Sequence, residues 1–246
     1  MTYLVKIIIM VLLFVPLSGD ANEGLLADLS EDTIRISADF NGAKLVLFGA
    51  IENPGDLVVV VTGPRNKAIV RRKDSVAGVW LNLSQVVFRD VPGYYAIAST
   101  RPLKNIKADS AFNINQVGIQ NLRVEGLEEL PYEERREWRD ALFSFMVENG
   151  RYKPNASNIK VVNNKLFRTE IEFPSSTPTG TYTVDTLLIR SSKVEGAWRA
   201  LIKVKKSGLG AKIYSFSYSH GLIFGIFAVF AAIAIGLAAN EAAKRT

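Results

Sequence analysis

Most of residues 25–106 alternates between apolar and polar side chains with a period of two, and no other feature constrains the fold as strongly. Because successive side chains of a β-strand point to opposite faces, this alternation indicates strands with one buried face. Residues 33–40 and 166–173 are clear examples, whereas residues 57–62 form a nearly continuous apolar run, typical of a strand covered on both faces. After residues 33–40, Asn41-Gly42 indicates a two-residue hairpin turn.

About nine such strands, separated by short turns, predict a mainly β chain built as an antiparallel immunoglobulin-like β-sandwich. One helix interrupts them: residues 132–148 carry an apolar stripe and end at Asn149-Gly150. We therefore predict a helical insertion at about residues 103–156. Only about 55 residues remain between Ser157 and Lys212, too few for a second sandwich of roughly 100 residues.

The N-terminus is typical of a secretory signal peptide at residues 1–21. Lys6 is followed by a short apolar run, and Gly19-Asp20-Ala21 gives the small-x-small pattern of a cleavage site after Ala21. An uncleaved N-terminal anchor is the alternative, although the run is shorter than the roughly 20 residues of a full span. Both alternatives place the following residues outside the cytoplasm.

Near the C-terminus, residues 221–239 form 19 consecutive uncharged and mostly apolar positions. At about 1.5 Å per residue, a helix of this length extends roughly 28 Å, which approaches the thickness of a bilayer core. Tyr214, Phe216 and Tyr218 precede it, where interfacial aromatic residues are expected. The sequence predicts a transmembrane helix over residues 213–240.

The orientation follows from the export signal. Lys244 and Arg245 favour a cytoplasmic tail at residues 241–246. The upstream bases locally argue for the reverse; they are Lys203, Lys205, Lys206 and Lys212. Long domains are translocated largely regardless of charge, so the signal peptide decides. We expect a single-pass protein of the bacterial inner membrane, with the sandwich of residues 22–212 in the periplasm.

Small residues follow one another along the predicted membrane helix at steps of three and four, which keeps them on one face. Such a stripe allows two helix backbones to approach closely. The sequence therefore predicts a packing face for a membrane-protein partner or for a second copy of the chain, formed by Gly221, Gly225, Ala228, Ala232 and Gly236.

The composition argues against most catalytic chemistry. The chain has no cysteine and one histidine, His220, so we expect no thiolate nucleophile, no cofactor and no multi-histidine metal site. Six glutamates between Glu125 and Glu137 lack the glycine and alternating ligands of a calcium loop, and a solvated helix flank explains them better. The net charge of +6 is modest, and with export it argues against nucleic-acid binding. A Ser-Lys or carboxylate site stays open.

Several stretches together resemble the alphaproteobacterial putative transmembrane protein family (Alph_Pro_TM). They are ADLSEDTIRISADFNGAKLVLFGAIE at residues 27–52, VVVVTGP, RRKD and GVW between residues 57 and 80, and the C-terminal apolar run. The resemblance covers nearly the whole chain and implies no known activity. Because genes of this family often neighbour sulfite/organosulfonate exporters, it also implies an accessory role beside such a transporter.

Residues and resemblance together predict a non-enzymatic binding or accessory protein for a membrane partner. Two alternatives remain: an envelope structural protein, and a hydrolase with a Ser-Lys or carboxylate site. A deep pocket with converging lysine and serine or paired acids would favour the hydrolase. An exposed apolar patch without a pocket would favour the structural protein.

Overall fold

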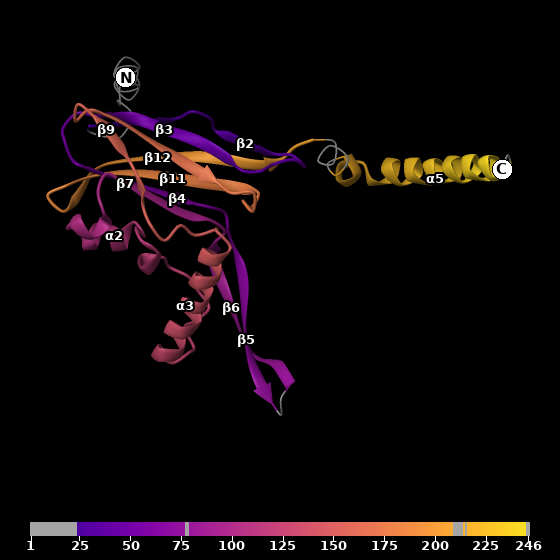
Figure 1. Cartoon of the computed structure of the whole chain (residues 1–246), viewed down its shortest axis with the longest axis horizontal. Helices are drawn as coiled ribbons and strands as arrows, with labels where there is room; N and C mark the ends of the chain where they lie inside the picture. The colour runs from indigo at the N-terminus through magenta and orange to yellow at the C-terminus, as the bar shows by residue number, and fades with distance from the viewer. Residues whose placement is uncertain (1–23, 77–78, 209–213, 215, 245–246) are drawn as a thin grey trace, which may run out of the picture.

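A computed structural model of the chain describes residues 24–76, 79–208, 214 and 216–244 (Figure 1). The described chain is mainly β, as the alternating pattern predicts. Its strands are β1 Leu25–Leu29, β2 Thr33–Ile36, β3 Ala43–Ile51, β4 Asp56–Thr62, β5 Arg65–Val76, β6 Val79–Pro92, β7 Tyr95–Ser99, β8 Ser157–Asn158, β9 Lys160–Val162, β10 Leu166–Phe173, β11 Gly180–Arg190 and β12 Lys193–Lys206. The helical elements are η1 Leu103–Asn105, α2 Asp109–Ile114, η2 Ile119–Asn121, α3 Tyr132–Glu148 and α5 Gly221–Lys244.

Two sheets face each other and enclose one apolar core. The four-stranded sheet has the order β1-β3-β10-β9, and the six-stranded sheet has the order β2-β12-β11-β4-β7-β8. Pairing is antiparallel except at β2–β12 and β7–β8. The buried side chains between the sheets include Leu45, Leu47, Leu57, Val59, Phe167, Phe173, Val184 and Ile202.

Outside the inserted segments, the strands follow the ABED and CFG arrangement of immunoglobulin-like sandwiches. Tyr182 lies near the start of β11, and its hydroxyl donates to the carbonyl oxygen of Pro178 at 2.7 Å. This contact has the geometry of the tyrosine corner at the corresponding strand of immunoglobulin domains.

The predicted hairpin at Asn41-Gly42 is wrong, because the strands on either side of it belong to different sheets. β2 pairs with β12 in the six-stranded sheet, whereas β3 pairs with β1 and β10 in the four-stranded sheet. Gly42 has φ 117°, and a Cβ there would meet the carbonyl oxygen of Phe173 at 2.8 Å. Gly42 is needed at this crossover because of its positive φ and the lack of room for a Cβ. The residue thus marks a sharp turn, but not a hairpin.

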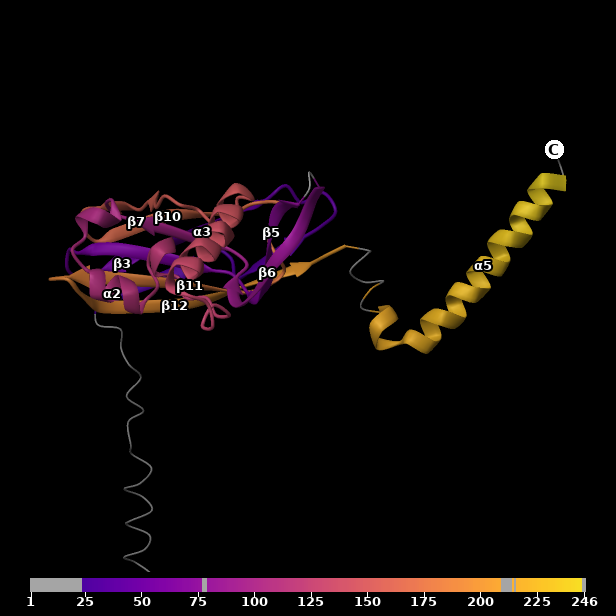
Figure 2. The same ribbon diagram turned by 90° about the horizontal axis from the view of Figure 1, so that it is seen from below.

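Residues 103–156 lie on the outer face of the six-stranded sheet, and Figure 2 shows α2 and α3 against its strands. Val58 and Val60 of β4 point into this second apolar cluster, while Val59 and Val61 point between the sheets. β4 is therefore buried on both faces, which accounts for its continuous apolar sequence. The helical side of the cluster is formed by Ala111, Phe112, Trp138, Leu142, Phe143 and Met146.

β5 and β6 leave the sandwich as a long two-stranded arm (Figure 1). β5 has 12 residues, so at about 3.3 Å per residue it extends about 40 Å. Ala68, Val70, Val86 and Phe88, from the half of the arm nearest the sandwich, pack into the cluster beneath α3. The arm is thus anchored on one side by the inserted helices.

The predicted fold class is wrong in its membrane part. Over the described ranges, which end at residue 244, no helix is both long enough and apolar enough to cross a bilayer. α5 forms at Gly221–Lys244, and its uncharged, mostly apolar run ends at Ala239, before the end of the helix. The predicted signal peptide, residues 1–21, lies outside the described residues.

Candidate functional site

The predicted stripe of small residues falls on α5. Its members, Gly221, Gly225, Ala228, Ala232 and Gly236, are all exposed. A Cβ added at any of the three glycines would meet nothing within 4 Å, so the structure brings no other part of the described chain against them. A role of this stripe in packing against another chain stays a prediction.

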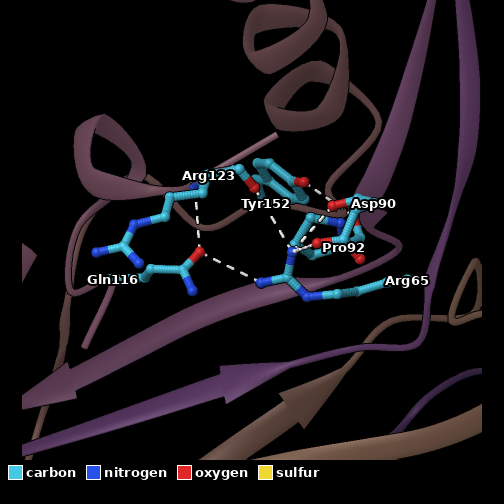
Figure 3. A network of polar contacts seen from close by, with 6 residues as sticks. All are labelled: Arg65, Asp90, Pro92, Gln116, Arg123 and Tyr152. Carbon is cyan, nitrogen blue, oxygen red and sulfur yellow. Dashed lines mark hydrogen bonds and ion pairs between the residues drawn. The ribbon is translucent and has the colours of Figure 1, made fainter. Parts of the chain in front are cut away.

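The most connected polar site lies at the base of the arm, around Arg65 (Figure 3). The Arg65 guanidinium donates from Nη1 to Asp90 Oδ2 at 2.8 Å and to the Asp90 carbonyl oxygen at 2.9 Å. Nη2 donates to Gln116 Oε1 at 3.2 Å, and this oxygen also accepts the backbone N–H of Arg123 at 3.0 Å. We call Arg65, Asp90, Gln116, Arg123 and Tyr152 the hub. One guanidinium joins both arm strands to the insertion.

Two hub residues have strained backbones. Asp90 has φ 57° and Gln116 has φ 53°, although neither is glycine. A left-handed conformation costs an ordinary residue about 1–2 kcal/mol, and it persists where the surroundings determine it. Both residues are held by Arg65, so the hub fixes the chain direction at both turns.

Buried tyrosines extend the hub into the apolar cluster. The Tyr95 hydroxyl donates to the Gln116 carbonyl oxygen at 2.7 Å and accepts the Gly118 N–H at 2.8 Å. The Tyr152 hydroxyl donates to the Pro92 carbonyl oxygen at 2.8 Å. Burial raises the pKa of Tyr95 and of Tyr152 well above the ordinary value for tyrosine. Both phenols therefore stay protonated donors at neutral pH.

The outward face of the arm is apolar at its centre and basic around it. Ile69 lies directly opposite Val87 in the register, and these side chains are 54% and 43% exposed. Lys67, Arg71 and Arg89 lie nearby and are also exposed. Apolar area with a charged rim is typical of protein-binding surfaces.

Three hollows of about 580, 650 and 510 Å³ lie beside Asn158, at the edge between the two sheets. The acids that line them, Asp56, Glu170 and Glu172, each pair with a basic side chain. Arg101 donates to both carboxylate oxygens of Asp56, at 2.6 and 2.5 Å, and Lys44 lies 2.8 Å from Glu172. The hydrogen bond and charge of Lys44 lower the pKa of Glu172, whereas a general acid needs a raised pKa.

Ser99 and Ser157 line one of these hollows together with Lys104, and the hydrolase alternative stays a prediction. Ser99 Oγ donates to the Arg101 carbonyl oxygen at 2.8 Å, so it is engaged with backbone rather than with a base. In the part of the chain that the structure describes, no three His, Cys, Asp or Glu side chains group as metal ligands. Glu128 binds the Gly126 N–H and Glu137 lies 3.7 Å from Arg72, so these acids occupy ordinary surface contacts.

No local sequence signal indicates the hub. Arg65 and Asp90 are 25 positions apart, and Arg65 and Gln116 are 51 positions apart. Pro64-Arg65-Asn66 is recognisable only as a turn, and a lone glutamine carries no pattern. Only the folded chain brings these side chains together.

A family model described as "Putative transmembrane protein (Alph_Pro_TM)" matches residues 24–245. The match begins at the first described residue and extends through the arm, the insertion and α5. No curated protein matches the chain.

Proposed function

The chain belongs to the Alph_Pro_TM family of putative transmembrane proteins, and from this premise we propose that it is a membrane-associated, non-enzymatic binding protein that holds a protein partner with the β5–β6 arm. The observation that carries the proposal is the hub. A two-stranded ribbon alone is only marginally stable in water. Here one arginine, two strained residues and buried tyrosines fix its base, and apolar side chains hold it against α3.

Bracing of this kind favours binding because a rigid surface loses little conformational entropy when a partner docks. Arg72 lies with its guanidinium 5.4 Å from the centre of the Trp138 ring and 3.7 Å from Glu137, so α3 supports the arm from the side. The outward face then presents Ile69 and Val87 within a basic rim.

The basic rim favours an acidic partner surface, since complementary charge guides association. We place the arm on the periplasmic side of the bacterial inner membrane, where the export signal would deliver it. A membrane protein such as the predicted sulfite/organosulfonate exporter is the class of partner that this placement favours.

A site-specific photo-crosslinker tests the proposal in the full chain in native membranes. With the crosslinker at Ile69 or Val87, we expect a discrete adduct with one membrane protein. The matched control is Leu201 on β12, which is 52% exposed and belongs to the six-stranded sheet rather than to the arm. Equal adducts from Leu201 and Ile69 would overturn the proposal.

Charge reversal on the arm is the second test of the proposal. Lys67→Glu with Arg71→Glu should abolish the Ile69 adduct, because it reverses the rim. Lys203→Glu with Lys205→Glu makes the same charge change on β12 and should leave the adduct intact. Equal losses from both pairs would indicate nonspecific electrostatics and would contradict a docking arm.

A further inference from the structure

The outer face of the four-stranded sheet carries an exposed apolar row. Leu26 of β1, Ala50 of β3, Leu166 of β10 and Val162 of β9 lie side by side in the register. Three of them are large and 71%, 59% and 56% exposed (Leu26, Leu166 and Val162). Exposed apolar groups arranged in one row indicate a surface that binds something.

The row is not flat. Ala50 is small and lies between Leu26 and Leu166, and a hollow of about 650 Å³ opens there. The hollow is lined mostly by apolar groups, among them Leu25, Ile51 and Leu166. It has room for one leucine-sized side chain from outside.

The next row is charged, and its charges are arranged asymmetrically. Asp28, Phe48, Arg168 and Lys160 follow one another across the sheet, with the acid on β1 and the bases on β10 and β9. Arg168 and Lys160 are directly opposite each other, and like charges in such pairs destabilise a sheet. Arg168 has an acidic partner in the adjacent outward row, Glu170 at 3.4 Å, whereas no acid lies between the two bases in their own row.

We propose that this face binds the same face of a second copy, related by a two-fold axis parallel to the strands. The axis places β1 over β9 of the copy and β3 over β10 of the copy. Leu26 of one chain then lies over Val162 of the copy, and Leu166 of the copy enters the hollow above Ala50. The alternative is a two-fold axis perpendicular to the strands and passing through the apolar row. Because this row lies near the end of β3, the two sheets would then overlap only at that row, and the rest of each sheet would extend away from its copy.

The same operation matches the charges. Asp28 lies over Lys160 of the copy, and Phe48 lies under Arg168 of the copy, where the ring can receive the cation. Lys44 lies over Glu172 of the copy. Within its own chain, Lys44 already pairs with Glu172 at 2.8 Å. Three of the four outward rows of β3 therefore meet a complement, as an isologous interface requires. In the fourth row, Glu170 lies over Val46 of the copy and keeps its pairing with Arg168 of its own chain.

The size of the face fits a weak dimer. Four strands spaced at about 4.8 Å and a nine-residue β3 give about 19 by 30 Å, or roughly 600 Å² for each copy. The total, roughly 1,200 Å², is at the lower end for specific interfaces. We expect a dimer that dissociates on dilution.

Sedimentation of the full chain in detergent, over a range of concentrations, measures this equilibrium. Leu166→Lys should raise the dimer Kd by about tenfold or more, because it places a charge in the hollow. Leu201→Lys is the matched control on an exposed β12 position and should leave the Kd unchanged. A full chain that stays monomeric, or equal effects of both variants, would overturn the proposal.

A charge swap tests the axis itself. Asp28→Lys and Lys160→Asp should each weaken the dimer about threefold, and the double variant should restore it. Within one chain these residues lie on opposite edges of the sheet, about 14 Å apart, so only contact between copies can produce the rescue. Absence of rescue would exclude this axis.

Crosslinking gives an independent reading, because the chain has no cysteine. Asp28→Cys protein mixed with Lys160→Cys protein should give a dimer with a short bismaleimide. Neither protein should do so alone, since the axis separates identical residues. Crosslinking of either variant alone would contradict the proposed axis. A chain that is monomeric and binds lipid or another protein through this face would overturn the dimer.

Discussion

The two outer faces of the sandwich differ in what lies on them. The outer face of the six-stranded sheet is covered by the insertion, and Val58 and Val60 there are almost fully buried. The outer face of the four-stranded sheet carries none of the described helices, and Phe48 and Leu166 there are 44% and 59% exposed. One fold thus has a face that is part of its core and a face that is a surface.

An apolar side chain has a different role on each of the two faces. On the covered face, it contributes to folding, because its burial is completed within the chain. On the open face, the same residue type contributes little to the single chain and is available for association.

Leucine truncation should separate the faces most strongly. Leu142→Ala on α3 removes a side chain that is 1% exposed and should lower the free energy of unfolding by about 2–5 kcal/mol. Leu166→Ala on the open face should change it by no more than about 0.5 kcal/mol at a dilution that keeps the chain monomeric. Urea unfolding followed by circular dichroism measures both, and equal losses would end the contrast.

The hub should give the next largest effect, because it fastens the arm to the covered side. Arg65→Ala leaves Gln116 Oε1 and the Asp90 carboxylate without their guanidinium partner and should cost about 1–3 kcal/mol. Arg65→Lys should not restore the loss, since an ammonium cannot reach both acceptors in the same fork. Hydrogen exchange should accelerate at residues 65–70 and 86–92, while the strands of the four-stranded sheet keep their protection.

Alkaline pH should weaken the covered side through its tyrosines. Burial raises the pKa of Tyr95 in the folded state. The contribution of Tyr95 to the free energy of unfolding is therefore complete below about pH 10, and it falls as the pH rises toward the folded-state pKa. Tyr95→Phe should be less stable than the parent at pH 7, because its hydrogen bonds are lost. The gap, which is the difference in free energy of unfolding between the parent and Tyr95→Phe, should narrow by about 1 kcal/mol by about pH 11. The parent loses stability there as tyrosine ionises in the unfolded state, whereas phenylalanine does not ionise. A gap that widens would contradict this assignment.

The smallest effect is expected on the open face. Lys44→Met removes the partner of Glu172, yet the pair is exposed and should contribute nothing measurable to unfolding. The pKa of the Glu172 carboxyl should rise toward its ordinary value, since its hydrogen bond to Lys44 is what lowers it. Titration followed by NMR measures that change, and a clear loss of stability would mean that this face is less open than its exposure indicates.

Local patterns predicted the elements well and their surroundings poorly. The alternation at residues 166–173 and the apolar stripe at residues 132–148 match β10 and α3 at both ends. Asn41-Gly42 failed because a turn motif does not say in which sheet the next strand pairs. The hub could not be predicted because it depends on tertiary contacts. The prediction of a transmembrane helix was wrong because it rested on a single apolar run.

The parallel pairing of β2 with β12 has a consequence for synthesis. It joins Thr33–Ile36, near the start of the sandwich, to Lys203–Lys206 at its end. Contacts so distant along the chain form late and slow the folding of β-rich proteins. A chain that emerges with its N-terminus first cannot close the six-stranded sheet until Lys206 is free, and until then the edge of β11 is open to other strands. The time between emergence and closure is when this protein is most exposed to aggregation.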